Sequence, residues 1–333
     1  MTNSLSKKPS MAYSTSSSKK SGFRMTPIFN GLQPLKMAVH PCTADSLPKN
    51  RIFQQAARTI FPLCIAIGLL LGVDALAGPE EDRLVMRNYY SERFPDVPMQ
   101  EFANGLYAFD EIARDQWLEM EDFPSYEIAV EDGQALFELP FANGKSYANC
   151  FDNGGIGVRQ NYPYFDSNSG EVMTLELAIN RCRENHNEEP LPYRTGDLAA
   201  IAAYMSYTSR GNVINVQVPP DNPAALAAYE SGKEQYYTRR GQLNFSCASC
   251  HLQSAGLSLR ADRLSTTLGQ ATHWPVYRAK WGEIGTIQHR FAECNSQVFA
   301  KPLEAQSVEY RNLEYFLTYM SNGLELNGPA SRR

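Results

Sequence analysis

Five residues in the last third of the chain have the types and spacing of a covalent haem site. They read Cys247-Ala-Ser-Cys250-His251. In a Cys-x-x-Cys-His motif the two thiols form thioether bonds with the vinyl groups of haem, and the adjacent histidine binds the iron. A thioredoxin-type redox pair and half of a zinc site have similar spacings, but no βαβ pattern surrounds this motif and no second Cys-x-x-Cys completes a zinc site. The motif therefore predicts one covalently bound haem c, with His251 as an axial iron ligand.

The second axial ligand has several candidates. An ordinary electron-transfer cytochrome takes a methionine from the loop after the haem motif, but no methionine lies between Cys250 and Met320. Met320 itself lies on an apolar helical stripe, which favours a place in the core. Of the remaining candidates, His273, His289 and Cys294, the cysteine is the strongest because a thiolate is a good ligand for ferric iron. A buried inert thiol or an intermolecular disulfide is the alternative role for Cys294.

The number of cysteines bears on the same question. The chain has seven, and two of them lie in an N-terminal region that we expect to be removed. If the two haem cysteines are set aside and Cys150 pairs with Cys182, Cys294 is the only thiol left. Arg290 precedes Cys294 by four residues, so on a helix both side chains project from one face. A guanidinium in that place can bind an oxyanion next to the sulfur.

The first 77 residues have the features of a segment that is removed on export. Residues 1–50 are rich in Ser, Lys and Pro, and residues 51–77 have a positive start, an apolar run over Ile60–Val73 and a small-residue cleavage site at Ala75-Leu76-Ala77. The apolar run is too short to span a bilayer core of roughly 30 Å. We therefore expect a periplasmic protein, cleaved near Ala77 and without a membrane anchor.

The remaining chain is acidic. Residues 78–333 contain 22 Lys and Arg against 34 Asp and Glu, which gives a net charge of −12. This charge argues against nucleic acid as a general partner. The whole chain is 43% hydrophobic, so the protein can bury a core, and its length suggests two domains.

Two helices are expected on either side of the haem motif. Asn222 and Pro223 suit the start of a helix, and apolar residues recur at helical spacing over residues 223–240. Another apolar stripe runs over residues 307–321 and stops at Asn322-Gly323. This is the layout of a class I cytochrome c domain. Because Gly and Pro interrupt the chain over residues 211–223, we place this domain at 213–333 and the first at 78–212.

The first domain has features that match the second. Leu198–Ser206 aligns without gaps on Leu313–Ser321, and Tyr147-Ala-Asn-Cys150-Phe151 stands where the second half has its haem motif. Cys182 corresponds roughly to Cys294. Tyr147 replaces the first attachment cysteine and Phe151 replaces the ligand histidine. We therefore expect a mainly α protein with two class I cytochrome c-like domains, the first without haem. A chance likeness of two amphipathic helices is the alternative.

Several stretches of the second half resemble the SoxA family, the larger subunits of the SoxAX cytochromes of sulfur oxidation. The resemblance covers about residues 90–325 and is most specific over residues 244–323. The stretches that carry it are Phe245-Ser-Cys-Ala-Ser-Cys-His251, Trp274-Pro-Val-Tyr-Arg278, Gly285-Thr-Ile-Gln-His-Arg-Phe-Ala-Glu-Cys-Asn295 and the C-terminal helix.

The resemblance implies an enzyme and its site. It implies that thiosulfate is conjugated oxidatively to a cysteine of the carrier protein SoxY, and that electrons leave through haem to the small cytochrome SoxX. His251 and Cys294 would be the axial ligands, Cys294 would carry a persulfide, and Arg290 would lie near the substrate. Many members hold a second haem in the first domain. This chain departs from them at Tyr147 and Phe151.

That departure makes the chain similar to the single-haem members, in which two cysteines pair instead. Here those cysteines would be Cys150 and Cys182. The alternative function is a pure periplasmic electron-transfer cytochrome in which Cys294 is only an axial ligand. Mass spectrometry of Cys294 distinguishes the two functions, because only the enzyme is expected to carry extra sulfur there.

Overall fold

The structure is a computed structural model that describes residues 78–260 and 262–332. The expected signal segment, residues 1–77, lies outside the described residues. The described residues belong to one compact unit. The domain boundary near residue 212 stays a prediction.

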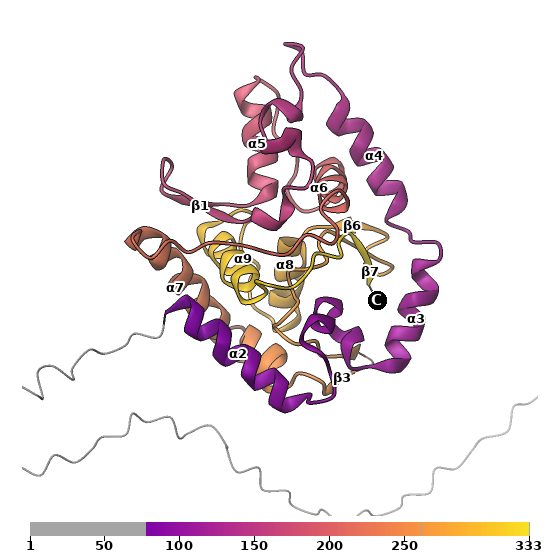
Figure 1. Ribbon diagram of the computed structural model, residues 1–333, viewed down its shortest axis with the longest axis vertical. Coiled ribbons are helices and arrows are strands. Elements are labelled where there is room, and N and C mark those ends of the chain that lie inside the picture. The colour runs from indigo at the N-terminus through magenta and orange to yellow at the C-terminus, as the bar shows by residue number, and fades with distance from the viewer. Residues whose placement is uncertain (1–77, 261, 333) are drawn as a thin grey trace, which may run out of the picture. The chain divides into compact units, whose positions relative to one another are not determined.

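The described chain is mainly helical, as predicted, and its short strands form three small sheets (Figure 1). The helices are α2 (Pro79–Arg93), α3 (Glu111–Glu121), α4 (Glu127–Glu138), α5 (Leu175–Asn185), α6 (Asp197–Tyr207), α7 (Pro223–Tyr237), α8 (Ile287–Gln297) and α9 (Val308–Met320), with shorter helical turns η2 (Met99–Ala108), η3 (Tyr147–Asn149), η4 (Asp152–Gly155), η5 (Arg159–Asn161) and η6 (Ser249–Gln253).

Each sheet is built around a hairpin of short antiparallel strands. The first sheet pairs β1 (Tyr164–Asp166) with β2 (Glu171–Met173), and the second pairs β3 (Ser258–Leu259) with β4 (Asp262–Arg263). In the third, β5 (Val276–Arg278) lies between β6 (Glu283–Gly285), which is antiparallel to it, and β7 (Ala330–Arg332), which is parallel to it. The C-terminus is therefore joined to the hairpin that precedes α8.

The two helices expected around the haem motif are present. Asn222 caps α7 by accepting hydrogen bonds from the backbone of the first turn, and Ser307 caps α9 in the same way. Helix α7 ends at Tyr237, three residues before the predicted end at residue 240. The reason is local, because Arg240 pairs with Phe245 across a turn instead of continuing the helix.

The structure contains an internal repeat with a constant spacing of 112 residues. Adding 112 to the numbers of β1, β2 and α5 gives the bounds of β5, β6 and α8 without a gap. The same spacing relates two cis peptide bonds, Tyr162-Pro163 and Trp274-Pro275, and the capping residues Thr174 and Thr286. This constant spacing covers residues 157–209 and 269–321. We call residues 127–209, which begin with α4, the first copy, and residues 223–321, which begin with α7 and include the haem motif, the second copy.

The predicted alignment of α6 on α9 was wrong by three residues. It placed Leu198 on Leu313, whereas the spacing of 112 places Leu198 on Tyr310. Glycine contacts support this register. A Cβ on Gly133 of α4 would lie 2.0 Å from the Ala200 carbonyl oxygen, and one on Gly232 of α7 would lie 2.0 Å from that of Asn312. Ala200 and Asn312 are 112 residues apart, so both copies use a glycine for the same close helix crossing.

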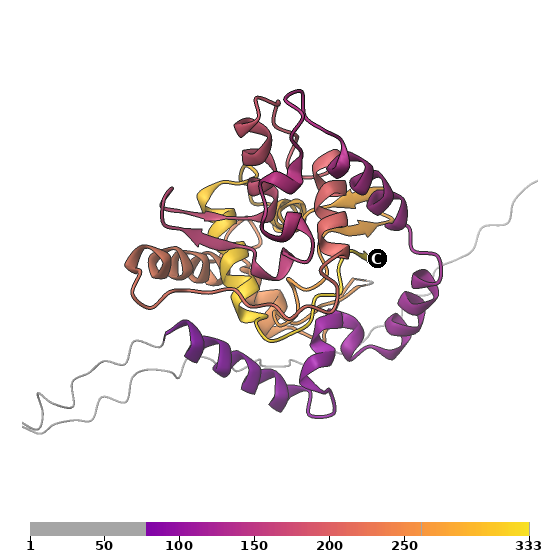
Figure 2. The ribbon, with the colours of Figure 1, turned by 45° about the horizontal axis from the view of Figure 1, so that its top comes forward.

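The N-terminal helix packs on the second copy. Both ribbon views show α2 beside α7 and α9 (Figures 1 and 2). Its Tyr90 is fully buried in the core cluster that holds Leu313, Phe316 and Met320. A second cluster around Leu175, Ile201 and Met205 forms the core of the first copy. Residues far apart in sequence therefore build the environment of the haem motif.

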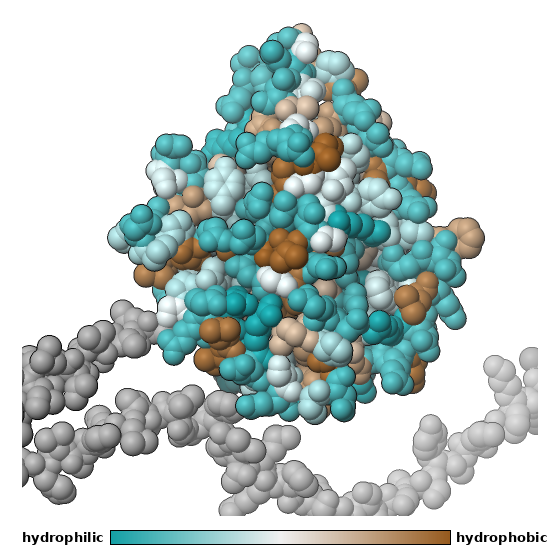
Figure 3. Space-filling model, in the orientation of Figure 1, coloured by the Kyte–Doolittle hydropathy of each residue, from teal (hydrophilic) through white to brown (hydrophobic). Residues whose placement is uncertain are grey.

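The surface is mostly polar, with apolar side chains in separate patches on the face that Figure 3 shows. Within residues 78–260 and 262–332, no helix has the length and apolar character needed to cross a membrane.

Candidate haem and sulfur site

The haem motif lies where the chain turns after α7. Residues Ser249–Gln253 form a π-helical turn, a type of turn that is common at functional sites. Cys247 and Cys250 are free thiols and are partly buried. Burial raises the pKa of Cys247 to about 12 and also raises that of Cys250. Two thiols of this kind, three residues apart, suit thioether attachment to haem.

His251 is oriented as an iron ligand would be. Its Nδ1 donates a hydrogen bond to the Ser265 carbonyl at 3.1 Å, which leaves Nε2 with a free lone pair. The backbone beside it is also fixed, because the Tyr90 hydroxyl donates to the His251 carbonyl at 2.6 Å. Burial lowers the pKa of His251 to about 4, so the ring is neutral at pH 7, as metal binding requires. These features fit a haem.

Helix α8 brings the other predicted residues to the motif. Thr286 caps this helix, and Cys294 lies in its last turn as a free, partly buried thiol. A thiolate at Cys294 would raise the pKa of both Cys247 and Cys250, so the three thiols lie near enough to interact electrostatically. Arg290 also acts electrostatically on Cys250 and His251. The structure therefore brings together five predicted site residues from two separate segments, the haem motif (Cys247, Cys250 and His251) and α8 (Arg290 and Cys294).

The other candidate ligands have different surroundings. His273 contacts Thr272 and Trp274, and burial lowers its pKa well below the usual value. His289 lies against the Trp281 ring, with ring centroids 4.4 Å apart. Met320 is fully buried in the hydrophobic core, as the sequence favoured.

A charged cluster beside Cys294 was not predicted. We call it the Glu293 cluster, and it comprises Glu293, Arg278, Lys280 and Arg290. Glu293 forms ion pairs with all three cations, including Arg278 at 3.3 Å. Burial alone would raise the pKa of Glu293, but the hydrogen bond with Lys280 and the charges of Arg290 and Arg278 lower it to about 2.

The corresponding place in the first copy is built differently. Cys150 and Cys182 form the expected disulfide, with their Cα atoms 5.8 Å apart. Tyr147 is buried, stacks on Phe137 and accepts a hydrogen bond from Arg183 at 2.9 Å. At this disulfide and His186, three potential metal-ligand atoms lie within 4.8 Å of one another, but the two sulfurs are bonded to each other.

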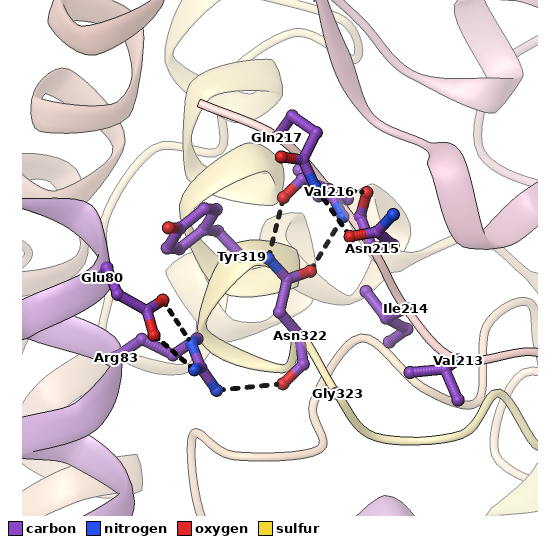
Figure 4. A pocket seen from close by; sticks show the side chains of 10 residues that line it. All are labelled: Glu80, Arg83, Val213, Ile214, Asn215, Val216, Gln217, Tyr319, Asn322 and Gly323. Atoms are coloured by element: carbon purple, nitrogen blue, oxygen red, sulfur yellow. Dashed lines mark hydrogen bonds and ion pairs between the residues drawn. The ribbon is translucent and has the colours of Figure 1, made fainter. Parts of the chain in front are cut away.

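A pocket of about 520 Å³ lies between α2, residues 213–217 and the end of α9 (Figure 4). No cysteine or histidine lines it. Its charged residues, Glu80 and Arg83, bind each other at 2.6 Å, and Arg83 also donates to the Asn322 carbonyl. These polar groups hold α2 against the end of α9, and we assign the pocket no chemistry.

Known proteins are similar to this chain in sequence and in fold. The family model described as "SoxA/TsdA, cytochrome c domain" matches residues 132–214 and 231–326. The L-cysteine S-thiosulfotransferase subunit SoxA of Allochromatium vinosum is 52% identical over 265 residues, which cover 80% of this chain and 94% of that protein. The SoxA subunit of Chlorobaculum tepidum is 52% identical over 254 residues, 76% of this chain and 88% of that protein.

A solved structure agrees with these relatives. The crystal structure of SoxXA from P. pantotrophus matches with a TM-score of 0.60 and 33% sequence identity, over 68% of this chain and 86% of that one. The two chains are therefore similar in sequence as well as in fold.

Proposed function

The chain belongs to the SoxA family of cytochrome c proteins, and from this premise we propose that it is the SoxA subunit of an L-cysteine S-thiosulfotransferase. It conjugates thiosulfate oxidatively to a cysteine of a SoxY-type sulfur carrier. The observation that carries the proposal is the meeting of Cys294 and Arg290 with the haem motif, from segments about forty residues apart.

The haem is held by the second copy. We propose one haem c per chain, attached to Cys247 and Cys250, with His251 and Cys294 as axial ligands. The free Nε2 of His251 supports this assignment. In the first copy, Cys150 is bonded to Cys182, and buried Tyr147 stands where haem attachment would need the other cysteine. Haem bound at this site supplies a one-electron acceptor connected to a partner cytochrome.

Cys294 carries the sulfur chemistry. Its thiolate forms a bond with the outer sulfur of thiosulfate, and the pair gives up two electrons, which leave one at a time. The thiolate of the carrier cysteine then attacks that outer sulfur, the bond to Cys294 breaks, and Cys294 leaves as a thiolate. The carrier gains an S-thiosulfonate group, and Cys294 returns to its starting state. The family resemblance implies that Cys294 carries a persulfide at rest, and the terminal sulfur of that persulfide then takes the place of the thiolate in both steps and is regenerated as the carrier is modified.

Arg290 positions the substrate. Its guanidinium offers paired donors to the sulfonate oxygens and lies on the same helix face as Cys294. Holding the dianion there keeps its outer sulfur next to the cysteine, which lowers the entropic part of the barrier. The partner that receives electrons is a SoxX-type small cytochrome, and we place the complex in the periplasm.

The test replaces Cys294 by methionine. Cys294→Met is expected to keep one covalent haem per chain in a pyridine haemochrome assay, because attachment depends on Cys247 and Cys250. Its reduction potential is expected to rise, because a thioether donates less than a thiolate. Conjugation of thiosulfate to the carrier is expected to fall to background. Ser296→Ala, an exposed neighbour on α8, is the control.

Normal conjugation by Cys294→Met would contradict the proposal. The protein would then be an electron-transfer cytochrome in which Cys294 only binds iron. Peptide mass spectrometry of the native protein adds an independent check, since the proposal expects an extra sulfur atom on Cys294.

A further inference from the structure

The Glu293 cluster places three cations around one carboxylate. One carboxylate oxygen of Glu293 is shared by Arg290 and Arg278, and the other accepts from Lys280. Glu293 and Arg278 are mostly buried, with 14% and 12% of their side chains exposed, whereas Lys280 is 62% exposed. Three cations and one carboxylate leave the cluster with a formal charge of +2. Because a carboxylate with several partners cannot turn freely, Glu293 fixes where these cations lie.

Two elements build the cluster. The β5–β6 hairpin supplies Arg278 and Lys280, and α8 supplies Arg290 and Glu293. The Arg278 guanidinium also lies 5.3 Å from the centre of the Trp281 ring, on the turn between the two strands. Arg290 and Cys294 are four residues apart on α8, so this cation of the cluster lies on the helix face that carries the thiol used in the proposed function.

The first copy shows that the fold does not require this cluster. Its hairpin and helix have the same lengths and the same spacing as those of the second copy. Yet the residues 112 positions earlier are Asp166, Asn168, Ala178 and Arg181, in place of Arg278, Lys280, Arg290 and Glu293. The cysteine equivalent to Cys294 is Cys182, which is locked in a disulfide. The cluster is therefore present in the copy that has the free thiol and absent from the copy that has the same hairpin and helix but a disulfide.

We propose that Glu293 is a positioning residue that holds Arg278, Lys280 and Arg290 together as a binding site for a dianionic sulfur oxyanion beside Cys294. Three cations so close together repel one another, and the carboxylate between them offsets that repulsion. The charge of +2 matches a dianion such as thiosulfate. This inference rests on the proposed function and names the residues that select its substrate.

The test is Glu293→Gln in the complete haem-loaded complex with its partner cytochrome. The direction in which the Kd for thiosulfate changes decides the outcome. The substitution raises the charge of the cluster to +3. If Glu293 only reduced the net positive charge of the cluster, thiosulfate would bind more tightly to Glu293→Gln than to wild type. If Glu293 positions the cations, thiosulfate binds more weakly. We expect the Kd from isothermal titration calorimetry to rise about tenfold, the effect of losing one charge-assisted contact.

Turnover gives a second readout. In the conjugation assay the KM for thiosulfate is expected to rise about tenfold while kcat changes less than about twofold, because Cys294 and the haem are untouched. Glu293→Asp keeps the charge on a shorter side chain and is expected to restore part of the affinity. Arg181→Gln, at the equivalent position of the first copy, is the matched control and should leave the Kd unchanged.

An unchanged or lower Kd in Glu293→Gln, with a normal haem spectrum, would overturn the inference. The binding measurement decides this without turnover. Failure of the proposed function would look different, since the wild-type complex would then bind thiosulfate without transferring it to the carrier.

Discussion

The chemistry proposed for Cys294 depends on a charged neighbour one helical turn away. Arg290 shares the α8 face with Cys294 and is held by Glu293. We expect Arg290→Ala to leave the haem spectrum nearly unchanged, because arginine is not an iron ligand. Loss of a charged hydrogen bond, worth roughly 1.5–3 kcal/mol, should lower kcat/KM for thiosulfate about tenfold to a hundredfold.

Steady-state kinetics with carrier protein measures this effect. Arg290→Lys is the control, since it keeps the positive charge but loses the paired donors of the guanidinium. Its kcat/KM should fall between those of wild type and Arg290→Ala. A kcat/KM in Arg290→Ala equal to wild type would remove Arg290 from the site.

At the scale of single elements, two glycines allow the helix pairs to cross closely. Gly232 of α7 faces the backbone of Asn312, and a Cβ there would lie 2.0 Å from the carbonyl oxygen. Gly-to-Ala changes in helices usually stabilise, but this one must push two helices apart. We expect Gly232→Ala to destabilise the protein by about 1–3 kcal/mol in denaturant unfolding followed by circular dichroism.

The control for this change is Glu234→Ala, an exposed position on the same helix. Gly133→Ala makes the equivalent clash in the copy without a haem motif. It should cost similar stability while leaving haem content unchanged. Stabilisation by Gly232→Ala would show that the helices move apart at little cost.

A covalent bond joins Cys150, the residue after η3, to α5 in the first copy. The Cys150–Cys182 disulfide closes a loop across a sequence separation of 32 residues. On the chain-entropy model, replacing both cysteines by serine should cost roughly 3–4 kcal/mol in the free energy of unfolding. The change should leave the haem spectrum intact, because the disulfide lies in the other copy. Equal unfolding free energies with and without the disulfide would mean that it restricts the unfolded chain very little.

The sequence was most informative where the chemistry is local. Asn222 was recognisable as the start of a helix, and Cys247, Cys250 and His251 form a motif within five residues. The Glu293 cluster was missed because hairpin packing brings Arg278 and Lys280 to α8, and no short spacing reveals that. The repeat was found in the wrong register because similar residue types, Tyr-Met-Ser, were matched. In the structure the register is set by where Gly133 and Gly232 meet the opposite helix.

At the scale of the whole molecule, the two copies meet at a buried polar group. Arg159 and Glu176 come from the first copy, and Gln288 and Glu314 come from the second. All four side chains are at most 2% exposed. Gln288 donates to Glu314 at 2.9 Å, and Arg159 lies 3.9 Å from the other carboxylate oxygen of Glu314. Glu176 and Gln288 are 112 residues apart, so equivalent positions of the repeat both interact with Glu314 where the copies join.

Glu314 and Glu176 are both buried, and Arg159 lies only as near as 3.9 Å to Glu314, so Glu314 is expected to retain a proton. Burial and repulsion from Glu176 raise the pKa of Glu314 to about 8, against the opposing effects of Arg159 and Gln288. In the unfolded chain this carboxyl titrates near 4.5. Between these two values the folded protein binds the proton and the unfolded chain does not. The proton therefore stabilises the fold fully below about pH 4.5, and this contribution is lost as the pH rises towards 8.

We expect Glu314→Gln to remove this pH dependence. The amide keeps the hydrogen bond from Gln288 and needs no proton, so the free energy of unfolding should change less between pH 5 and pH 9 than in wild type. The variant should be more stable than wild type at pH 9, by up to a few kcal/mol. Urea unfolding at each pH measures the difference, with Glu309→Gln on the exposed face of α9 as control. If Glu314→Gln is instead less stable at pH 9, the pairing of ionised Glu314 with Arg159 outweighs the cost of its burial, and the two copies are joined by a stabilising buried ion pair.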